Sequence, residues 1–486
     1  MRKARDYQQF CLDEIKVKFS QGKKKVLVVA PTGTGKGFII TEMAKGCESK
    51  GKKFLFIVRG RNLVDQTYKM FIKNGIDCGV IMANHWAVKH SALVKIASID
   101  TLKSRGEREE FDLVCIDEAH LLVSDADIKA LESISCNYSV GFTATPWQKQ
   151  SMEHLANDII QPINAKTAIS RGFLAPAVYF GAKPPDLKGV KKSGDDWNQG
   201  QLEERMSVLQ GDIVDFWIKN GERRPTMFFG VNVNHSKEVC KEFIKNGVKA
   251  VHVDANVSLS ERALVIQQIE NKEIEVICSV GTMTTGVDIP IISCIILGRP
   301  TQSFNLIKQI VGRGSRPIYA QGFPLNTDEE RVAAIAAGPK PNFYIFDHGN
   351  CVSRHGYFYE ITPEIVLNGV KEVDTGPKVS QCPLHYVYYT GRYCHQCGQP
   401  EENENEVKSD VETDINKSIQ RLAQFDPNAA EILEFIQSKK LIAKKMKYKS
   451  GWIYYQIKDQ IGEEFADILY PNHKRAMMYA RKAKRQ

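Results

Sequence analysis

Short apolar runs that alternate with helix-like stretches leave few folds open to this chain of 486 residues. The first series consists of KKVLVVA, KKFLFIV, VKIASI, FDLVCID and SVGFTAT. The second, after residue 220, consists of PTMFFGVN, VKAVHVDA, EVICSV, CIILGRP and NFYIFDHGN. Each run is typical of a strand buried inside a parallel sheet, and the stretches between them are typical of crossover helices. The two series therefore predict two tandem α/β domains with a cleft between them.

Changes in composition divide the chain further. Residues 181–205 begin with a stretch rich in Pro, Gly and charge, which indicates a linker or an exposed loop. The predicted parts are a first domain at 1–180, the linker, a second domain at 206–375, a Cys/His hairpin at 376–400, an acidic linker at 401–415 and a basic helical module at 416–486.

The net charge of +9 comes from one end of the chain. Residues 439–486 contain 13 Lys and Arg against 4 Asp and Glu, and the remainder is balanced. This tail predicts a polyanionic partner, most simply nucleic acid, although a solvated helical surface would have the same charge. No apolar run has the roughly 18 residues that a membrane span needs. Most cysteines are scattered singly in apolar runs, and the N-terminus has no secretory signal, so we expect a cytoplasmic protein.

A glycine-rich turn directly after the first apolar run predicts a nucleotide site. Its backbone N–H groups would close around phosphate oxygens at the start of a helix. The residues assigned to it are Pro31, Thr32, Gly33, Thr34, Gly35, Lys36 and Gly37. Lys36 would reach the terminal phosphates. Gly37 stands where a Ser or Thr hydroxyl usually binds Mg²⁺, and since water can occupy that position we expect a working ATPase.

Two adjacent carboxylates complete this predicted site. Asp117 and Glu118 follow the run LVCI, at the strand end where ligands bind in open α/β sheets. Asp117 is assigned to Mg²⁺, and Glu118 to the water that attacks the γ-phosphate. Acidic residues after a strand are often only helix caps. Their occurrence together with Lys36 favours catalysis.

The motifs APTGTGK, DEAH, GFTATP, GTMTTGVDIP and QIVGRGSRP follow one another in the order found in superfamily 2 helicases. The chain resembles this superfamily from about residue 5 to 317. Its DEAH form is most similar to the XPB, RecG and UvsW group and to related phage DNA helicases. The resemblance implies two RecA-like domains that bind ATP and Mg²⁺ between them.

The resemblance also implies roles for individual residues, all numbered as in this sequence. Adenine recognition falls to Gln8 with Arg5. The catalytic set gains His120, Gln309 and the arginine fingers Arg313 and Arg316. Gly286 and Asp288 lie near the nucleotide, and Thr143 and Thr145 couple the two sites. The nucleic-acid backbone is bound by Arg59, Arg61, Gln66, Ser98, Thr101, Thr284 and Thr285.

Two appended features carry further expectations. Cys382, His385, Cys394 and Cys397 have spacings that suit a tetrahedral Zn²⁺ site, with His395 as a competing ligand and a hairpin without metal as the alternative. In the tail, Trp452 among lysines would stack on bases, or else form part of a small helical core.

Together these observations predict an ATP-dependent DNA helicase or translocase with ATP, Mg²⁺ and Zn²⁺ as cofactors. Its expected partners are single-stranded, forked or branched DNA and proteins of replication or recombination, in a host cytoplasm if a phage encodes it. Three alternatives stay open: an RNA helicase, the motor subunit of a restriction-type complex, and a DNA-binding scaffold with a weakened ATP site.

Overall fold

The computed structural model describes residues 3–105, 109–194, 196–281 and 288–359, and after them residues 361, 363–370, 373, 378–382, 386–390, 439, 455–456 and 458–459. The chain divides into two compact units, Met1–Pro377 and Lys378–Gln486. In the second unit, β16 (Val379–Gln381) and β17 (Tyr388–Thr390) form an antiparallel hairpin. No helix within the described residues is long and apolar enough to cross a membrane.

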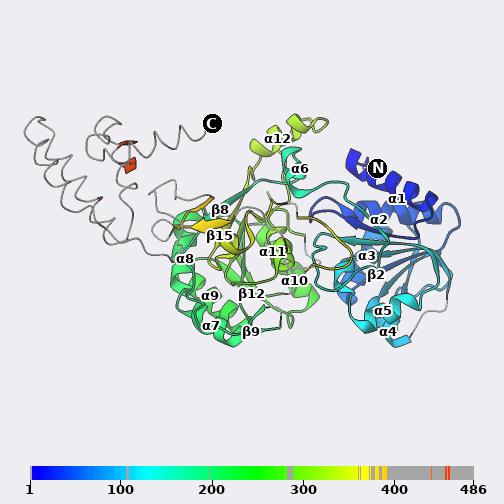
Figure 1. Cartoon of the computed structure of the whole chain (residues 1–486), viewed down its shortest axis with the longest axis horizontal. Coiled ribbons are helices and arrows are strands. Elements are labelled where there is room, and N and C mark those ends of the chain that lie inside the picture. Colours follow the sequence, from blue (N-terminus) through cyan, green and yellow to red (C-terminus); the bar gives the residue numbers. More distant parts are fainter. Residues whose placement is uncertain are drawn as a thin grey trace, which may run out of the picture. The chain divides into compact units, whose positions relative to one another are not determined.

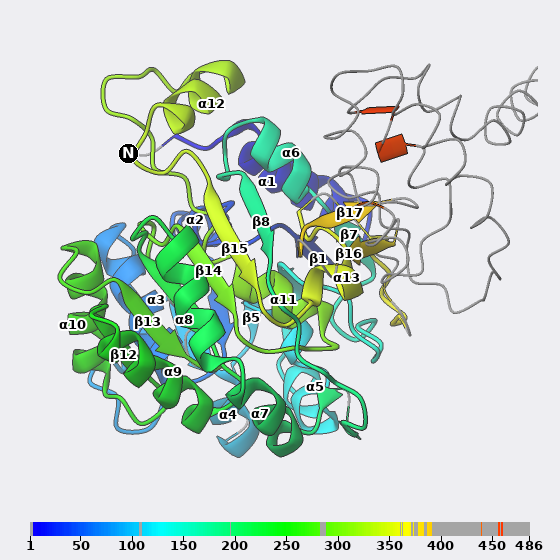
Figure 2. The same cartoon turned by 90° about the vertical axis from the view of Figure 1, so that its left-hand side faces the viewer.

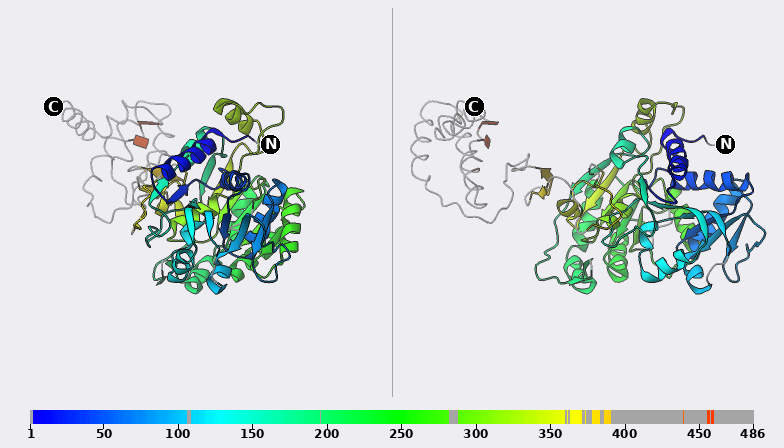
Figure 3. Two further views of the ribbon diagram at one scale, coloured as in Figure 1. Left: turned by 90° about the vertical axis from the view of Figure 1, so that its right-hand side faces the viewer. Right: turned by 45° about the vertical axis from the view of Figure 1, so that its right-hand side comes forward.

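The first unit contains two parallel sheets (Figure 1). The first is a 7-stranded sheet in the order β3-β4-β2-β5-β6-β1-β7. Its strands are β1 (Lys25–Val29), β2 (Phe54–Val58), β3 (Cys78–Ile81), β4 (Val94–Ser98), β5 (Phe111–Ile116), β6 (Cys136–Thr143) and β7 (Asp158–Ile160). Figure 3 shows this sheet, blue to cyan, from two further sides.

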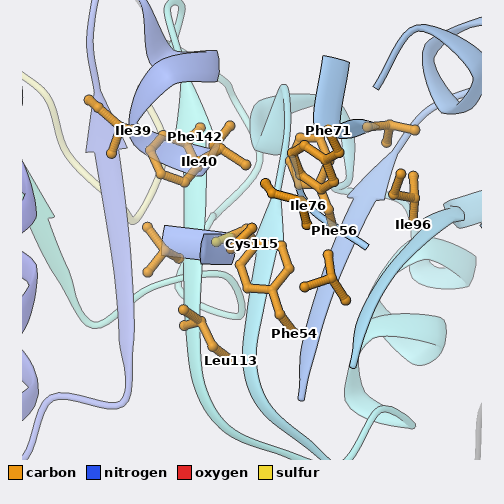
Figure 4. Close-up of a cluster of buried hydrophobic side chains, with 14 of the residues drawn as sticks. Ile39, Ile40, Phe54, Phe56, Phe71, Ile76, Ile96, Leu113, Cys115 and Phe142 are labelled. Atoms are coloured by element: carbon orange, nitrogen blue, oxygen red, sulfur yellow. The ribbon is translucent and has the colours of Figure 1, made fainter. Parts of the chain in front are cut away.

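Apolar residues on both faces of the first sheet explain why its strands read as continuous hydrophobic runs. Along β1, Val26 and Val28 enter one core and Leu27 and Val29 enter the other. Figure 4 shows the first of these cores, where Ile39 and Ile40 of α2 pack on the sheet. Burying each such side chain stabilises the fold by about 1.5–3 kcal/mol.

Most helices of this domain cover those two faces. The helices are α1 (Asp6–Ser20), α2 (Lys36–Glu48), α3 (Arg61–Lys73), α4 (Ile99–Arg105), α5 (Asp125–Glu132) and α6 (Ala165–Ser170), with the short 3-10 helix η1 (Ala119–Leu121). The first core receives residues of α1, α2 and α3, and the second receives residues of α4 and α5.

The second sheet has six parallel strands in the order β12-β13-β11-β14-β15-β8 (Figure 2). They are β8 (Ala177–Gly181), β11 (Thr226–Phe229), β12 (Ala250–Val253), β13 (Val276–Ser279), β14 (Cys294–Leu297) and β15 (Phe343–Asp347). Its helices are α7 (Gln199–Ser207), α8 (Gln210–Asn220), α9 (Val233–Lys245), α10 (Leu259–Glu270), α11 (Phe304–Val311), α12 (Asp328–Ala336) and α13 (Cys351–His355). The prediction of two α/β domains with parallel sheets is confirmed.

The predicted boundary at residue 180 and the linker at 181–205 are wrong. The boundary cuts through β8, which pairs with β15 of the second sheet. The supposed linker contains a small hairpin, β9 (Lys192–Ser193) with β10 (Asp196–Trp197), and most of α7. Leu202 is fully buried in the core of the second sheet. The Asp196 carboxylate accepts hydrogen bonds from the Arg299 side chain and the Thr301 hydroxyl.

The predicted end of the second domain at residue 375 is also wrong, because residues 364–370 return to the first domain. The Leu367 carbonyl accepts the Met152 N–H at 2.6 Å, and the Val370 N–H donates to the Gln148 carbonyl at 2.7 Å. Ile365 and Leu367 pack on the second core of the first sheet. We call residues 364–370 the return strap. The second domain is therefore inserted between two parts of the first.

Candidate nucleotide site and nucleic-acid track

The glycine-rich turn joins β1 to α2. Gly33 and Gly35 have φ angles of +94° and +86°, in the region that favours glycine. Gly35 caps α2, so the first N–H groups of the helix face the loop. The Lys36 ammonium donates to the Ala30 carbonyl at 3.0 Å. Burial lowers the pKa of Lys36, while the carboxylates of Glu118 and Asp117 oppose that shift.

The two predicted carboxylates lie at the carboxyl end of β5. Burial, aided by the neighbouring Glu118, raises the pKa of Asp117 to about 6. Glu118 has a φ of 44°, which is unusual for a residue with a side chain. Its Oε2 atom is buried and finds no hydrogen-bond partner among the described residues.

These carboxylates fit a divalent cation. The buried Glu118 oxygen without a partner and the Asp117 carboxyl with its raised pKa are both stabilised by added positive charge. Hard oxygen donors also suit Mg²⁺. Asp117 would therefore hold Mg²⁺, with Glu118 beside it. Gly37 contributes no side-chain ligand there.

His120 connects the first domain to the second. Its Nδ1 lies 2.9 Å from the Thr143 hydroxyl, and its Nε2 lies 3.2 Å from the Thr145 hydroxyl and 3.0 Å from Nε2 of Gln309. Since the Gln309 amide nitrogen donates, His120 Nε2 accepts and Nδ1 carries the proton. Burial lowers the pKa of His120 to about 3, so the ring is neutral. Its 3.4 Å approach to Glu118 is therefore not an ion pair.

The predicted arginine fingers follow α11, against the glycine-rich turn. A Cβ atom at Gly312 would lie only 2.9 Å from Cβ of Thr32, so glycine permits this approach. The Arg316 guanidinium pairs with Asp288 at 2.8 Å. Burial lowers the pKa of Arg313 to about 10, and Glu118 opposes that shift. Both arginines therefore face the turn from the other domain.

The predicted adenine-recognition residues pack against the glycine-rich turn. The Gln8 amide donates to the Thr34 carbonyl at 3.0 Å, and its oxygen accepts the Arg5 N–H at 3.0 Å. Both polar ends of Gln8 are thus engaged within the protein, and base reading by Gln8 remains a prediction. Tyr7, which the motifs did not predict, also contacts this turn: its hydroxyl donates to the same carbonyl at 2.6 Å.

Phe173 is a second residue that the sequence analysis missed. Three guanidinium groups lie over its ring, from Arg5 at 4.8 Å, Arg171 at 5.0 Å and Arg331 at 4.2 Å. Arg331 belongs to α12, so this cluster also ties the second domain to the first. Cation–π contacts bring these residues together from positions far apart in the sequence, and no local pattern announces them.

Lys308 is a third missed residue, in a small cavity of about 40 Å³ between the domains. The cavity is lined by Thr32 and Trp147 from one domain and Lys308 and Tyr359 from the other. The ammonium donates to a backbone carbonyl and lies 5.7 Å from the Trp147 ring centre. Burial lowers the pKa of Lys308 to about 7.

The described residues predicted to contact a nucleic-acid backbone lie at or just after the ends of β2 and β4, at the carboxyl end of the first sheet. β2 and β4 are parallel neighbours, so the residues after them are brought together. Arg61 and Gln66 are exposed on α3, while Arg59 donates to the Leu121 carbonyl at 3.1 Å. Ser98 is buried and accepts the Gly60 N–H at 3.3 Å. The Ser98 hydroxyl therefore supports the turn that carries the arginines.

Several predicted residues lie outside the described part of the chain. They are Thr284, Thr285, Gly286, His385, Cys394, Cys397 and Trp452. Cys382 is described and buried. Within the described residues, no group of three or more His, Cys, Asp or Glu is arranged to hold a metal ion.

Comparison with known families gives two matches. The family described as type III restriction enzyme, res subunit, matches residues 2–148. The family described as helicase conserved C-terminal domain matches residues 210–317. These two segments contain the glycine-rich turn, the carboxylates, His120 and the two arginines.

Individual relatives are more distant. A 51.5 kDa protein of a Lactococcus phage is 29% identical over 60% of this chain and 62% of its own length. A candidate ATP-dependent helicase of Saccharomyces cerevisiae, IRC3, is 29% identical over 64% of this chain and 49% of its own length. The chain thus spans about half to three fifths of these relatives.

A solved structure has the same fold. A fragment of a candidate HsdR subunit of a type I restriction enzyme from Vibrio vulnificus YJ016 superposes with a TM-score of 0.56 at 22% identity. The match covers 74% of this chain and 67% of that one. The fold, the two family matches and the order of the motifs agree. The two matched segments thus agree with the resemblance of the chain to superfamily 2 helicases.

Proposed function

We propose that this protein hydrolyses ATP with Mg²⁺ to move along DNA and to unwind or remodel it. The observation that carries the proposal is the hydrogen-bonded link from Thr143 and Thr145 through His120 to Gln309. It joins the two domains beside Lys36 and Glu118. Such a link can transmit a change at the nucleotide to the relative position of the domains.

Each group in the cleft has a chemical role in this proposal. Lys36 and the α2 N-terminus hold the phosphates, and Glu118 orients the attacking water. Arg313 and Arg316 stabilise charge that develops in the transition state. Asp117 would hold Mg²⁺, which neutralises phosphate charge when bound.

DNA is the proposed substrate, in single-stranded, forked or branched form. One structural relative belongs to a restriction enzyme, a class of enzyme that acts on DNA. The resemblance to the XPB, RecG and UvsW group favours branch migration, with replication or recombination proteins as partners. The basic tail, and a Zn²⁺ hairpin built on Cys382, His385, Cys394 and Cys397, would add DNA contacts. A cytoplasmic location, in an infected host if a phage encodes the chain, completes the proposal.

The motor subunit of a restriction-type complex is a second candidate. It is favoured by the match of residues 2–148 to a restriction res subunit and by the likeness to an HsdR fragment. In that case DNA cleavage would require a partner protein. Copurification of a nuclease with the chain would favour this candidate.

ATP hydrolysis with Mg²⁺ tests the proposal, with no nucleic acid, single-stranded DNA, forked or four-way DNA, and RNA compared. Glu118→Gln should lower the rate by about 100-fold or more, because the water loses its general base. Glu110→Gln, which alters an exposed carboxylate at the opposite end of β5, should leave the rate unchanged. Stimulation by RNA alone would identify an RNA helicase. Absence of turnover by the unaltered protein would indicate a DNA-binding scaffold and contradict the proposal.

A further inference from the structure

The loop after β3 folds back over the open edge of the first sheet. The Val80 N–H, on that edge, donates to the Ala87 carbonyl at 3.0 Å. A Cβ atom at Gly79 would lie 2.4 Å from the Lys89 carbonyl oxygen, so only glycine allows the loop to lie this close. The loop is therefore a fixed structure, and it protects an edge strand from pairing with other chains.

His85 anchors the loop to α3. The ring is buried, and its Nε2 lies 2.8 Å from Oδ1 of Asp65. Its Nδ1 accepts the Ala87 N–H at 3.1 Å. Both ring nitrogens thus fix the position of residue 86, which follows directly in the chain.

Trp86 projects outward from this anchored loop. Its side chain is 69% exposed, more than any other Trp, Tyr or Phe in the described part of the chain. The ring stacks on His85 at 5.4 Å and meets Tyr68 edge-on at 4.8 Å, so one face is supported from below. Edge protection explains why Ala87 lies inward. It does not by itself require an aromatic ring at the neighbouring exposed position.

The sheet places Trp86 in line with the predicted backbone contacts. β3, β4 and β2 are parallel neighbours, with Ile81 and Ile57 both paired to Ala97. The segments after the three strands therefore all begin at the carboxyl end of the first sheet. Along α3, Tyr68 follows Arg61 by seven residues, which is about 10 Å along the helix.

We infer that Trp86 stacks on a base of the single strand bound by the first domain, extending the track that begins at Arg61. The inference rests on the proposed function. An aromatic ring held from beneath loses little freedom on binding, and stacking accepts every base, as a translocase requires. The strand backbone would be held by the arginines while a base lies on the indole.

Binding of the full-length chain to a fluorescein-labelled single-stranded oligonucleotide, measured by anisotropy, tests the inference. Trp86→Ala should weaken binding by about 5- to 150-fold, and Trp86→Phe should retain most of the affinity. Tyr138→Ala is the matched control. Tyr138 is also an exposed ring of the first domain, stacked on Phe19. It lies near the amino end of β6, far from the carboxyl end of the sheet, so its loss should leave the affinity unchanged.

A second measurement separates stacking from a structural role. Photocrosslinking to an oligonucleotide that contains 5-iododeoxyuridine should label the peptide that includes Trp86. Wild-type affinity in Trp86→Ala would overturn the inference, as would equal losses in Trp86→Ala and Trp86→Phe with a lowered Tm and no crosslink. A change in self-association with unaltered affinity would reveal a protein interface and overturn it too. If the unaltered chain neither binds nucleic acid nor is stimulated by it, the proposed function itself fails.

Discussion

One residue of the nucleotide site, Glu118, has a strained backbone. Glu118 adopts a left-handed conformation that costs a residue with a side chain about 1–3 kcal/mol. The conformation leaves its Oε2 buried and without a hydrogen-bond partner among the described residues. The surrounding fold therefore holds a strained, under-satisfied carboxylate where positive charge is expected, and this arrangement is improved by a bound cation.

Gly37 offers a test of how that cation is held. A Cβ atom at Gly37 would meet Sδ of Met70 at 3.5 Å, an ordinary contact, so a small side chain fits. We expect Gly37→Ser to lower the Mg²⁺ concentration for half-maximal ATP hydrolysis several-fold, because a hydroxyl replaces a water ligand. Titration of hydrolysis with Mg²⁺ measures this.

Gly37→Ala is the control, since it adds the same Cβ without the hydroxyl. Replacing a helical glycine should also stabilise both variants, by up to about 1 kcal/mol for Gly37→Ala and by roughly half of that for Gly37→Ser. Equal Mg²⁺ dependence in the two would show that the hydroxyl finds no metal.

At the level of elements, ten predicted strands correspond to strands of the structure, because each is a buried apolar run. Three strands of the two parallel sheets were missed, and the reasons are physical. β7 has only three residues, and every residue of β8 is half-buried, so neither forms a clear apolar run. β3 lies at the edge of its sheet. A local pattern also cannot say which sheet a strand joins, and for this reason the boundary at residue 180 failed.

The candidate site was partly predictable for similar reasons. Lys36, Asp117 and Glu118 lie at strand ends, where order along the chain fixes position in space. The contacts of Phe173 and Lys308 depend on how the two domains meet. Ser98 has the predicted place at a strand end, but its hydroxyl faces inward to support a turn.

The corrected boundaries lead to a prediction about fragments. Residues 175–360 should form a folded second domain, since they include β8 and the buried Leu202. Residues 206–375 should not, because they lack that strand and carry the return strap without its partner Met152. Urea unfolding followed by circular dichroism would compare them. If fragment 206–375 unfolded as cooperatively as fragment 175–360, and at the same urea concentration, the corrected boundaries would be contradicted.

At the scale of the whole molecule, buried histidines set the response to acid. Burial lowers the pKa of His120 and His348 to about 3 and that of His235 and His355 to about 4. The unfolded chain, with ordinary values near 6.5, binds more protons in this interval, so stability is lost as the pH falls below about 6.5. Asp117, with its raised pKa, acts in the opposite direction below about pH 6, but it is one group against four.

We therefore expect the Tm to fall steadily from pH 7 to pH 5, as measured by calorimetry. His348→Asn should reduce the slope, because its ring contributes to the loss and lies away from the nucleotide cleft. A Tm that stays constant over this range would contradict the assignment of neutral, buried rings.

The return strap has a consequence for motion. The chain passes between the domains twice, near Leu174, which packs on the glycine-rich turn, and again between Tyr359 and Glu364, whose carbonyl accepts from the Trp147 indole. Because the chain crosses between the domains at two places, we expect the second domain to move mainly by rotation about the line that joins the two crossings. Twisting and sliding are resisted. A single proteolytic nick in either crossing would leave the two halves joined, with that axis lost.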